Sequence, residues 1–453
     1  MTETSINGEK VVTRFAPSPT GRFHVGGLRS ALYNYLFARK HGGKYILRCE
    51  DTDPIRSKKE YEDYFLELFQ WLGMEHDEYY RQSERTEIYR AYIEKMIKSG
   101  HAYVSKENPK EGGRTEVIRF KNPNRAVTFH DENLGDITFN TEELGDFVIA
   151  RDFDSPLYHL TVVVDDFEMG VTHIIRGQEH VSNTPRQILI QEAIGAPRPK
   201  YAHASVILNG ERAKLSKRDP LVRPALEYRD EGYLPEALLN FMALLGWNPG
   251  TEQEIFSLEE LTAAFSFERM QKQGAVFNPE KLEWMNKEYI KKMEPNAQLA
   301  MINQFMPDEI KTLAGYNEKR NHIAPILLER ISHFGELREM YTNGELGYYF
   351  TQPEYEKNML FWKEERDPAK LTERLAKVRD IINEMDEGSF SKESVKEAIW
   401  SYAEAEGRGQ VLWPLRFALS GREKSPDPFQ LASILGKAEA LRRITFAIAL
   451  HHE

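Results

Sequence analysis

The sequence predicts a doubly wound α/β domain that is interrupted by a β-rich insertion and followed by an all-α region. Apolar runs typical of buried strands alternate with helical patterns on both sides of a segment whose apolar residues repeat every second position. Beyond Arg218 the helical pattern continues alone. Alternation of strand and helix on both sides of an insertion implies that one sheet is assembled from two separated stretches of chain.

The stretch from Val11 to Asp53 is expected to form a strand, a loop, a helix and a second strand. Its loop contains two prolines, which fix the backbone and cannot donate to a strand ladder. The helix should begin after Gly26-Gly27, and the second strand should run from Lys44 to Arg48. Strand, glycine-rich loop and helix N-terminus together present N–H groups and a positive dipole, an arrangement that favours phosphate.

The segments that follow complete the expected fold. Residues 57–105 are predicted to be helical, and residues 114–151 to form short antiparallel strands separated by turns. The apolar stretch 158–177 predicts buried strands of a parallel sheet. Thr184 and Pro185 predict the start of a helix that Gly195 closes. After Arg218, apolar residues at helical spacing predict helices to the end of the chain.

Two short motifs are suited to ATP, although each has a plainer explanation. His24-Val-Gly-Gly27 places an imidazole beside a helix start, and alone it would pass for an ordinary strand–helix turn. Lys214-Leu-Ser-Lys-Arg218 offers two ammonium groups that can hold a triphosphate, and alone it would pass for a solvated basic loop. The chain lacks the dinucleotide fingerprint and the P-loop pattern.

The two motifs together resemble the signatures of class I aminoacyl-tRNA synthetases. Two segments, Arg14-Phe-Ala-Pro-Ser-Pro-Thr-Gly21 and Arg48-Cys-Glu-Asp-Thr-Asp53, are similar in sequence to the corresponding segments of bacterial glutamyl-tRNA synthetases. The resemblance continues in family order through most of the chain, in Tyr158-His-Leu-Thr-Val-Val-Val-Asp-Asp166, Ile174-Ile-Arg-Gly-Gln-Glu-His180, Tyr233-Leu-Pro-Glu-Ala-Leu-Leu-Asn240 and Pro414-Leu-Arg-Phe-Ala-Leu419.

The resemblance implies a domain organisation and an activity. Residues 1–105 and 152–220 would form a split Rossmann-like catalytic domain, 106–151 an inserted acceptor-end-binding domain, 221–294 a helical stem-contact domain and 295–453 an all-α anticodon-binding domain. The implied activity is that of a glutamate–tRNA ligase, which forms glutamyl-adenylate from ATP and L-glutamate and transfers glutamate to the 3′-terminal adenosine of tRNA(Glu). Relatives often carry a longer insertion, sometimes with zinc, but the compact segment at 106–114 holds no ligand set.

Matching positions then assign residues to the two substrates. Glutamate has a second carboxylate, so arginine, whose fork binds carboxylates, is expected in its site. The expected glutamate-binding residues are Arg14, Ala16, Ser18, Glu50, Tyr158 and Arg176; relatives have an asparagine near Val162, and that contact is not carried over. The expected ATP-binding residues are His24, Gly26, Gly27, Glu179, Ile207, Leu208, Lys214, Ser216 and Lys217, of which His24, Lys214 and Lys217 are expected to be catalytic.

Alternatives remain at this stage. Arg14 and Glu50 could simply pair with each other across adjacent strands. The enzyme could be a glutaminyl-tRNA synthetase, which the Ala16-Pro-Ser-Pro19 wording and the helical C-terminus disfavour, or a glutamyl enzyme that also charges tRNA(Gln). A third alternative is a truncated enzyme that glutamylates a tRNA base. It is disfavoured because such an enzyme lacks an anticodon domain, whereas this chain continues with predicted helices after Pro295. A non-catalytic tRNA-binding paralogue is disfavoured because both motifs are intact.

Composition sets the remaining expectations. The 453 residues carry 60 basic and 71 acidic side chains, a net charge of −11, which argues against indiscriminate binding of polyanions but not against a local basic groove. The N-terminal residues do not resemble a signal peptide, and no apolar run approaches a membrane span. One cysteine rules out an intramolecular disulfide framework and favours the cytoplasm, and a monomer is expected. Cys49 is the single cysteine and is expected to be buried. The expected cofactors are ATP and Mg²⁺, with no protein-bound metal.

Overall fold

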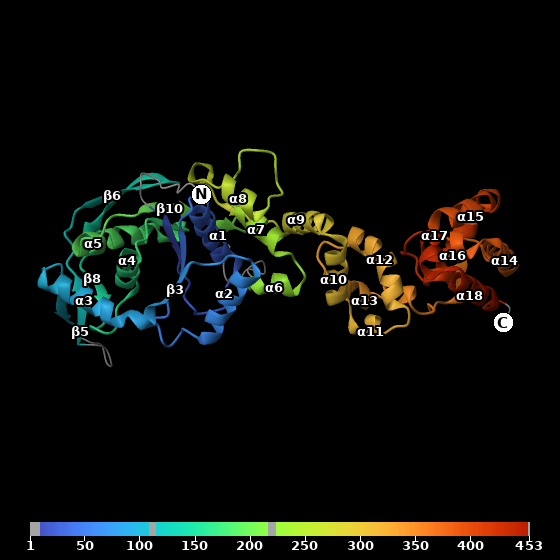
Figure 1. Cartoon of the computed structure of the whole chain (residues 1–453), viewed down its shortest axis with the longest axis horizontal. Coiled ribbons are helices and arrows are strands. Elements are labelled where there is room, and N and C mark those ends of the chain that lie inside the picture. The colour runs from blue at the N-terminus through green and yellow to red at the C-terminus, as the bar shows by residue number, and fades with distance from the viewer. Residues whose placement is uncertain (1–9, 108–114, 216–222, 452–453) are drawn as a thin grey trace. The chain divides into compact units, whose positions relative to one another are not determined.

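The computed structural model describes residues 10–107, 115–215 and 223–451. By its internal contacts the chain divides into two units between Tyr289 and Ile290. The first unit is built on strands and helices, and the second on helices (Figure 1).

Two sheets, one parallel and one mixed, meet at the centre of the first unit. One has the strand order β1-β2-β3, with β1 (Val12–Phe15), β2 (Lys44–Cys49) and β3 (Glu78–Arg81) all parallel. The other has the order β7-β6-β10-β9, in which β9 (His173–Gly177), β10 (Lys200–Ala204) and β6 (Ala126–Asp131) run parallel and β7 (Gly135–Asn140) is antiparallel to β6. The Thr172 N–H donates to the Val12 carbonyl at 3.0 Å, so β9 begins beside β1.

The strand order therefore runs outward in opposite directions from β1 and β9. Such a switch point leaves a crevice at the carboxyl ends of the two central strands, and ligands of open α/β sheets bind there. In this chain those carboxyl ends are Phe15 and Gly177.

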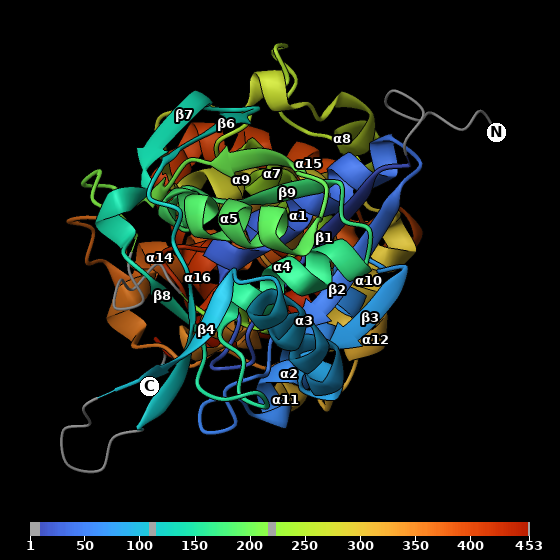
Figure 2. The same cartoon turned by 90° about the vertical axis from the view of Figure 1, so that its left-hand side faces the viewer.

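Helices cover both faces of the strands. Ile46 and Leu47 are adjacent in β2 and both fully buried, and they belong to two different hydrophobic clusters. One cluster includes apolar residues of α1 (Val25–Lys40) and α2 (Lys59–Trp71), and the other those of α3 (Thr86–Lys98), α4 (Tyr158–Glu168) and α5 (Thr184–Ile194). Figure 2 shows α4 and α5 side by side on the near face. The predicted doubly wound fold is thus confirmed.

Three sequence predictions in this unit were wrong, of which the smallest error is that the chain after Arg218 was expected to be wholly helical, although residues 275 and 276 form the strand β12 (Ala275–Val276). The stretch 158–177 was expected to be strands, but residues 158–168 form α4, and only β9 is extended. Val162, Val163 and Val164 are all buried, and a helix buried on every side shows no period that separates it from a strand. Residues 57–105 were expected to be helical, yet they contain β3 and the start of β4 (Ala102–Lys106).

The predicted antiparallel strands of the insertion exist, but they belong to two sheets. β5 (Glu116–Phe120) and β8 (Phe147–Ala150) join β4 in the order β4-β5-β8. The hairpin of β6 and β7 instead extends the sheet of β10, where Asp131 pairs with Tyr201. The insertion thereby places one of its acidic residues beside β10.

Short elements complete the first unit, and Cys49 is buried in it as expected. The strand β11 (Ile207–Leu208) pairs with β12 (Ala275–Val276). The helices are α6 (Ala225–Asp230), α7 (Pro235–Leu244), α8 (Leu258–Ala264) and α9 (Pro279–Lys292).

The second unit confirms the predicted all-α region: its described residues form helices and turns without a strand. The helices are α10 (Pro295–Phe305), α11 (Asp308–Lys311), α12 (Tyr316–Arg330), α13 (Glu336–Thr342), α14 (Pro368–Glu384), α15 (Lys392–Glu406), α16 (Arg408–Ser420), α17 (Pro428–Leu435) and α18 (Lys437–Ala449). None of the helices in the described part of the chain is long and apolar enough to cross a membrane. The finer division into four domains stays a prediction.

Candidate active site

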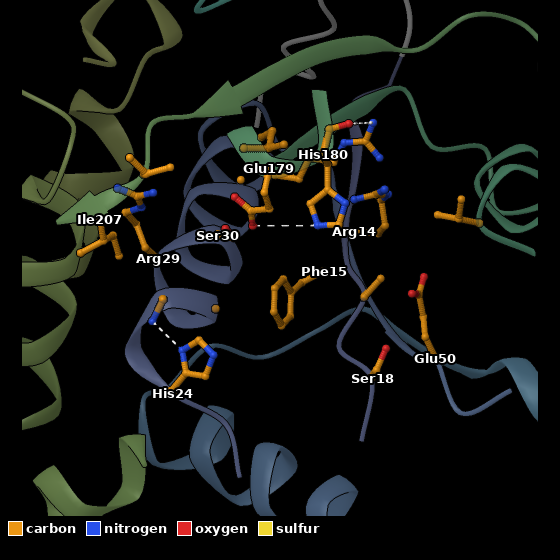
Figure 3. A pocket seen from close by; sticks show the side chains of 18 of the residues that line it. Arg14, Phe15, Ser18, His24, Arg29, Ser30, Glu50, Glu179, His180 and Ile207 are labelled. Atoms are coloured by element: carbon orange, nitrogen blue, oxygen red, sulfur yellow. Dashed lines mark hydrogen bonds and ion pairs between the residues drawn. The ribbon is translucent and has the colours of Figure 1, made fainter. Parts of the chain in front are cut away.

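A cavity of about 610 Å³ opens at the carboxyl ends of β1 and β9, where the switch point predicts a ligand site. Its lining comes from segments that are far apart in the sequence. Figure 3 shows Arg14, Ser18 and Glu50 toward one end and Arg29 and Ile207 toward the other, with Phe15 between them. The cavity therefore has room for two chemically different groups placed end to end.

Most of the predicted site residues line this one cavity. Leu208 does not; its carbonyl accepts from the Phe277 N–H, and its side chain packs over Gly274. Ser216 and Lys217 lie outside the described residues. The predicted residues that line the cavity are Arg14, Ala16, Ser18, His24, Gly26, Gly27, Glu50, Tyr158, Arg176, Glu179, Ile207 and Lys214.

The first turn of α1 forms the floor of one end. His24 is the N-cap of α1, and its Nδ1 accepts from the Gly26 N–H at 3.2 Å. A Cβ at residue 27 would lie 2.7 Å from the Phe23 ring, so glycine is needed for this close packing. Gly26 and Gly27 place the N-terminus of α1 at the cavity, and the positive end of the helix dipole there suits a phosphate group.

At the other end, Arg14 belongs to a buried set of paired charges, here called the Arg14 network: Arg14, Arg48, Glu50, Asp165 and Asp166. Arg14 holds Asp166 through Nε at 3.0 Å and Nη2 at 3.2 Å. Arg48 donates from Nη1 to the same carboxylate at 2.7 Å and from Nη2 to Glu50 at 3.1 Å. The pairing of Arg14 with Glu50, considered as an alternative from the sequence, is therefore wrong.

The two carboxyl groups nearest Arg48 are tuned in opposite directions. Burial alone would raise the pKa of Asp166, but Arg14 and Arg48 outweigh it and hold that pKa below the ordinary value. Burial raises the pKa of Glu50, and the attraction of Arg48 and Arg14 only partly opposes it. Asp166 is thus a firmly ionised partner of two arginines, while Glu50 faces the cavity as a carboxylate with less compensation.

Arg176 is surrounded differently, by what is here called the Arg176 cluster: Arg176, Thr184, Gln187, His203 and Asp131. Its Nε donates to His203 Nε2 at 3.1 Å, its Nη1 to Gln187 Oε1 at 2.8 Å and its Nη2 to Thr184 Oγ1 at 2.8 Å. Burial lowers the pKa of Arg176. Every one of these acceptors is neutral, and Arg176 forms no ion pair with the described residues.

Sequence reasoning missed several lining residues, of which Arg29 is the most informative. It is 3 % exposed, and its guanidinium donates to the carbonyls of Leu245, at 3.0 Å, and Ser205. An arginine directly after a core leucine of an amphipathic helix was the available signal. The other missed residues include Phe15, Ser30, His180 and Val206, and Val162, whose contact was not carried over, also lines the cavity. Burial lowers the pKa of His180 to about 4.

The charges of the lining favour anionic ligands. The lining contains four basic side chains, those of Arg14, Arg29, Arg176 and Lys214, and two acidic ones, those of Glu50 and Glu179. A basic lining at a helix N-terminus binds a polyphosphate, and buried arginines bind carboxylates. Among the described residues no group of His, Cys, Asp and Glu side chains could hold a metal ion.

Comparison with known protein families gives two matches that together cover nearly the whole chain. The family described as tRNA synthetases class I (E and Q), catalytic domain, matches residues 10–112 and 106–284. The family described as anticodon binding domain matches residues 280–448.

Two relatives and one solved structure that are similar to this chain are named glutamate–tRNA ligases. A glutamate–tRNA ligase of Aquifex aeolicus is 42% identical over 96% of this chain and 98% of its own length. One of Carboxydothermus hydrogenoformans is 38% identical over 96% of this chain and 99% of its own length. A crystal structure of a glutamate tRNA ligase from Elizabethkingia meningosepticum, in complex with its amino acid, has a TM-score of 0.87 and 34% identity, covering 97% of this chain and 99% of that one.

Proposed function

This chain belongs to the glutamate–tRNA ligases of the class I tRNA synthetases, and on that premise we propose that its cavity joins ATP and L-glutamate and passes glutamate to the 3′-terminal adenosine of tRNA(Glu). One observation carries the proposal: the N-terminus of α1, which suits phosphate, shares a single cavity with the buried Arg14 and Arg176. The relatives named above do not favour the glutaminyl alternative.

The chemistry needs positioning more than it needs an acid or a base. An oxygen of the glutamate α-carboxylate attacks the α-phosphorus of ATP, and the bond to pyrophosphate breaks. A ribose hydroxyl of the tRNA then attacks the carbonyl carbon of the adenylate, and AMP leaves. Because the first nucleophile is already ionised, the site's task is to align the two substrates and neutralise the charge on the phosphates.

Glutamate is assigned to the end with Arg14 and Arg176. Arg176 offers a buried cation to the side-chain carboxylate, and Glu50 offers an anion to the α-ammonium group. Arg14, whose guanidinium is held by Asp166, lines the same end of the cavity as Arg176 and Glu50. Ala16, Ser18 and Tyr158 complete this end.

ATP is assigned to the end with α1. The positive end of the α1 dipole at Gly26 and Gly27, the imidazole of His24 and the ammonium groups of Lys214 and Lys217 are suited to its phosphates. Glu179 lies near the expected ribose and Ile207 near the adenine. ATP would enter as its Mg²⁺ complex, in which the cation neutralises part of the phosphate charge.

The remaining assignments follow from the family. The second unit, matched as an anticodon binding domain, would hold the anticodon arm of the tRNA. The strands between residues 106 and 151 would hold the acceptor end, and the enzyme would act as a cytoplasmic monomer.

Charging of tRNA by the purified protein tests the proposal. With ATP, Mg²⁺, L-glutamate and tRNA(Glu), the protein should release pyrophosphate and form glutamyl-tRNA. Lys214→Ala should lower the rate about 10²-fold, a loss of about 3 kcal/mol of transition-state stabilisation. Lys200→Ala is the control, because Lys200 is exposed and does not line the cavity. Equal rates for the two variants would remove Lys214 from the mechanism.

Charging of tRNA(Glu) and tRNA(Gln) side by side, with glutamate and glutamine in competition, defines the substrates. We expect glutamate to be the amino acid used on tRNA(Glu). Preferential use of glutamine would contradict the proposal.

A further inference from the structure

The guanidinium of Arg176 is buried among acceptors that carry no charge. Of its five N–H groups, one points to His203, one to Gln187, one to Thr184 and one, at 3.4 Å, to the His180 carbonyl. Gln187 is 1 % exposed and Thr184 is fully buried, so neither is part of the cavity surface. The hydrogen bonds fix the guanidinium in place while its positive charge remains uncompensated by any of these partners.

His203 is kept in the form that can accept this hydrogen bond. Its Nδ1 lies 2.5 Å from Asp131 Oδ2, and its Nε2 accepts from Arg176 Nε. An acceptor nitrogen carries no proton, so the ring is neutral with its proton on Nδ1. Asp131 is in turn held by the N–H groups of Leu134 and His203. The carboxylate in this cluster thus lies behind the imidazole rather than on the guanidinium.

A buried cation without an anionic partner is costly, and an incoming anion relieves that cost. A carboxylate relieves it, whereas a carboxamide of the same shape does not. We propose that Gln187 is a specificity-determining positioning residue: by supplying a neutral acceptor to Arg176, it leaves the cationic charge for the substrate and so selects glutamate over glutamine. This inference rests on the proposed function, and it adds that the residues behind Arg176 set the selectivity.

Gln187→Glu tests the role of charge. The new carboxylate would lie where Oε1 now accepts, 2.8 Å from Nη1, and would compensate Arg176 from behind. We expect kcat/KM for glutamate in tRNA charging to fall at least about 30-fold and kcat/KM for glutamine to change less than about threefold, so that selectivity falls about tenfold or more. An unchanged ratio of the two values would overturn the inference.

Two control variants separate charge from geometry. Gln191→Glu makes the same change one turn further along α5, at a residue that is 4 % exposed and accepts from the Tyr201 hydroxyl, without touching Arg176. It should keep the wild-type ratio. Gln187→Met removes the acceptor without adding charge, and it should lower kcat/KM for both amino acids while the ratio stays within about threefold. If Gln187→Met loses as much selectivity as Gln187→Glu, the inference is wrong.

Thr184→Asp covers the case in which Gln187→Glu does not fold. It sets a carboxylate of nearly the same volume against Nη2. Because residue 184 is in the first turn of α5, an acidic side chain suits the helix dipole there. The same fall in selectivity is expected, and retention of wild-type selectivity would contradict the inference. If the wild-type protein itself does not use glutamate, the proposed function fails instead, and the two failures are distinct.

Discussion

The Arg14 network and the Arg176 cluster each place a buried arginine at the carboxyl end of a central strand, yet they treat its charge in opposite ways. Arg14 and the fully buried Arg48 share Asp166, and Arg48 also pairs with Glu50. Arg176 has hydrogen bonds to neutral groups. Whether a buried arginine mainly supports the fold or is mainly available to a ligand therefore depends on whether an anion of the protein compensates its charge, not on its burial.

The pairing of buried charges in the Arg14 network extends beyond the cavity. Asp165, behind Asp166 in α4, accepts from Arg85 Nε at 2.7 Å, Gln82 Nε2 at 2.8 Å and the Tyr89 hydroxyl at 2.9 Å. These bonds tie α4 to α3 and to the turn before it. Removing one member would leave its partners buried and unpaired, which is more destabilising than never having built the pair.

Asp166→Asn should therefore give the largest effect. It leaves Arg14 and Arg48 with one anion fewer, and we expect the free energy of unfolding to fall by about 3–5 kcal/mol, measured by urea denaturation. Asp154→Asn is the control, because Asp154 pairs with Arg90 at the surface and its loss should cost less than about 1 kcal/mol.

The pH dependence of that difference follows from the lowered pKa of Asp166. A carboxyl group with a depressed pKa in the folded state stabilises at pH values above its unfolded pKa, and this contribution is lost as the pH falls through the folded value. The gap between wild type and Asp166→Asn should stay constant from pH 7 to pH 5. A gap that closes within that range would show that Asp166 does not carry the charge assigned to it.

Arg176→Met should give the opposite pattern. Removing a cation that has no ion pair relieves its desolvation cost but leaves the buried acceptors of Gln187, Thr184 and His203 without a donor, so the free energy of unfolding should fall by about 1–2 kcal/mol, less than for Asp166→Asn. The kcat/KM for glutamate should fall about 10²- to 10³-fold, corresponding to about 3–4 kcal/mol. If Arg176→Met destabilises the fold as much as Asp166→Asn, the two arginines are not different in kind.

The sequence predicted that Arg14 and Arg176 lie close together, but it did not predict the residues that pack behind them. Arg14 and Arg176 stand at the ends of apolar strands within motifs, so their convergence at the switch point follows from the expected topology. The partner of Arg14 was not predicted, because Asp166 was expected in a strand and lies in α4. A helix buried on all sides has no apolar period from which the facing direction of a side chain can be read.

The surroundings of Arg176 were beyond sequence patterns for a different reason. Asp131 reaches His203, 72 positions further along the sequence, because its pairing with Tyr201 joins β6 to β10. Gln187 is one of several polar residues in α5, and nothing local distinguishes it from Gln191. Such contacts depend on tertiary packing that period and propensity do not encode.

Glu50→Gln should give a smaller effect, which refines the description of the Arg14 network. Glu50 accepts from Arg48 but has its pKa raised by burial, so it is the least compensated anion of the network. If it binds the α-ammonium group, Glu50→Gln should raise the KM for glutamate about tenfold, about 1.4 kcal/mol. The effect on unfolding should be smaller than that of Asp166→Asn, and an unchanged KM would assign Glu50 to the scaffold alone.

Val162→Asn should give the smallest change. It tests whether the cavity selects glutamate over glutamine by charge or by neutral hydrogen-bonding groups. Val162 lines the cavity and is 2 % exposed. An amide there adds hydrogen-bonding groups beside the substrate without altering the charge of Arg14 or Arg176. If charge governs selection, the ratio of kcat/KM for glutamate and glutamine should change by less than about threefold, below about 0.7 kcal/mol. A larger shift, measured in the same competition assay that serves Gln187→Glu, would mean that neutral groups share the selection with the buried cation.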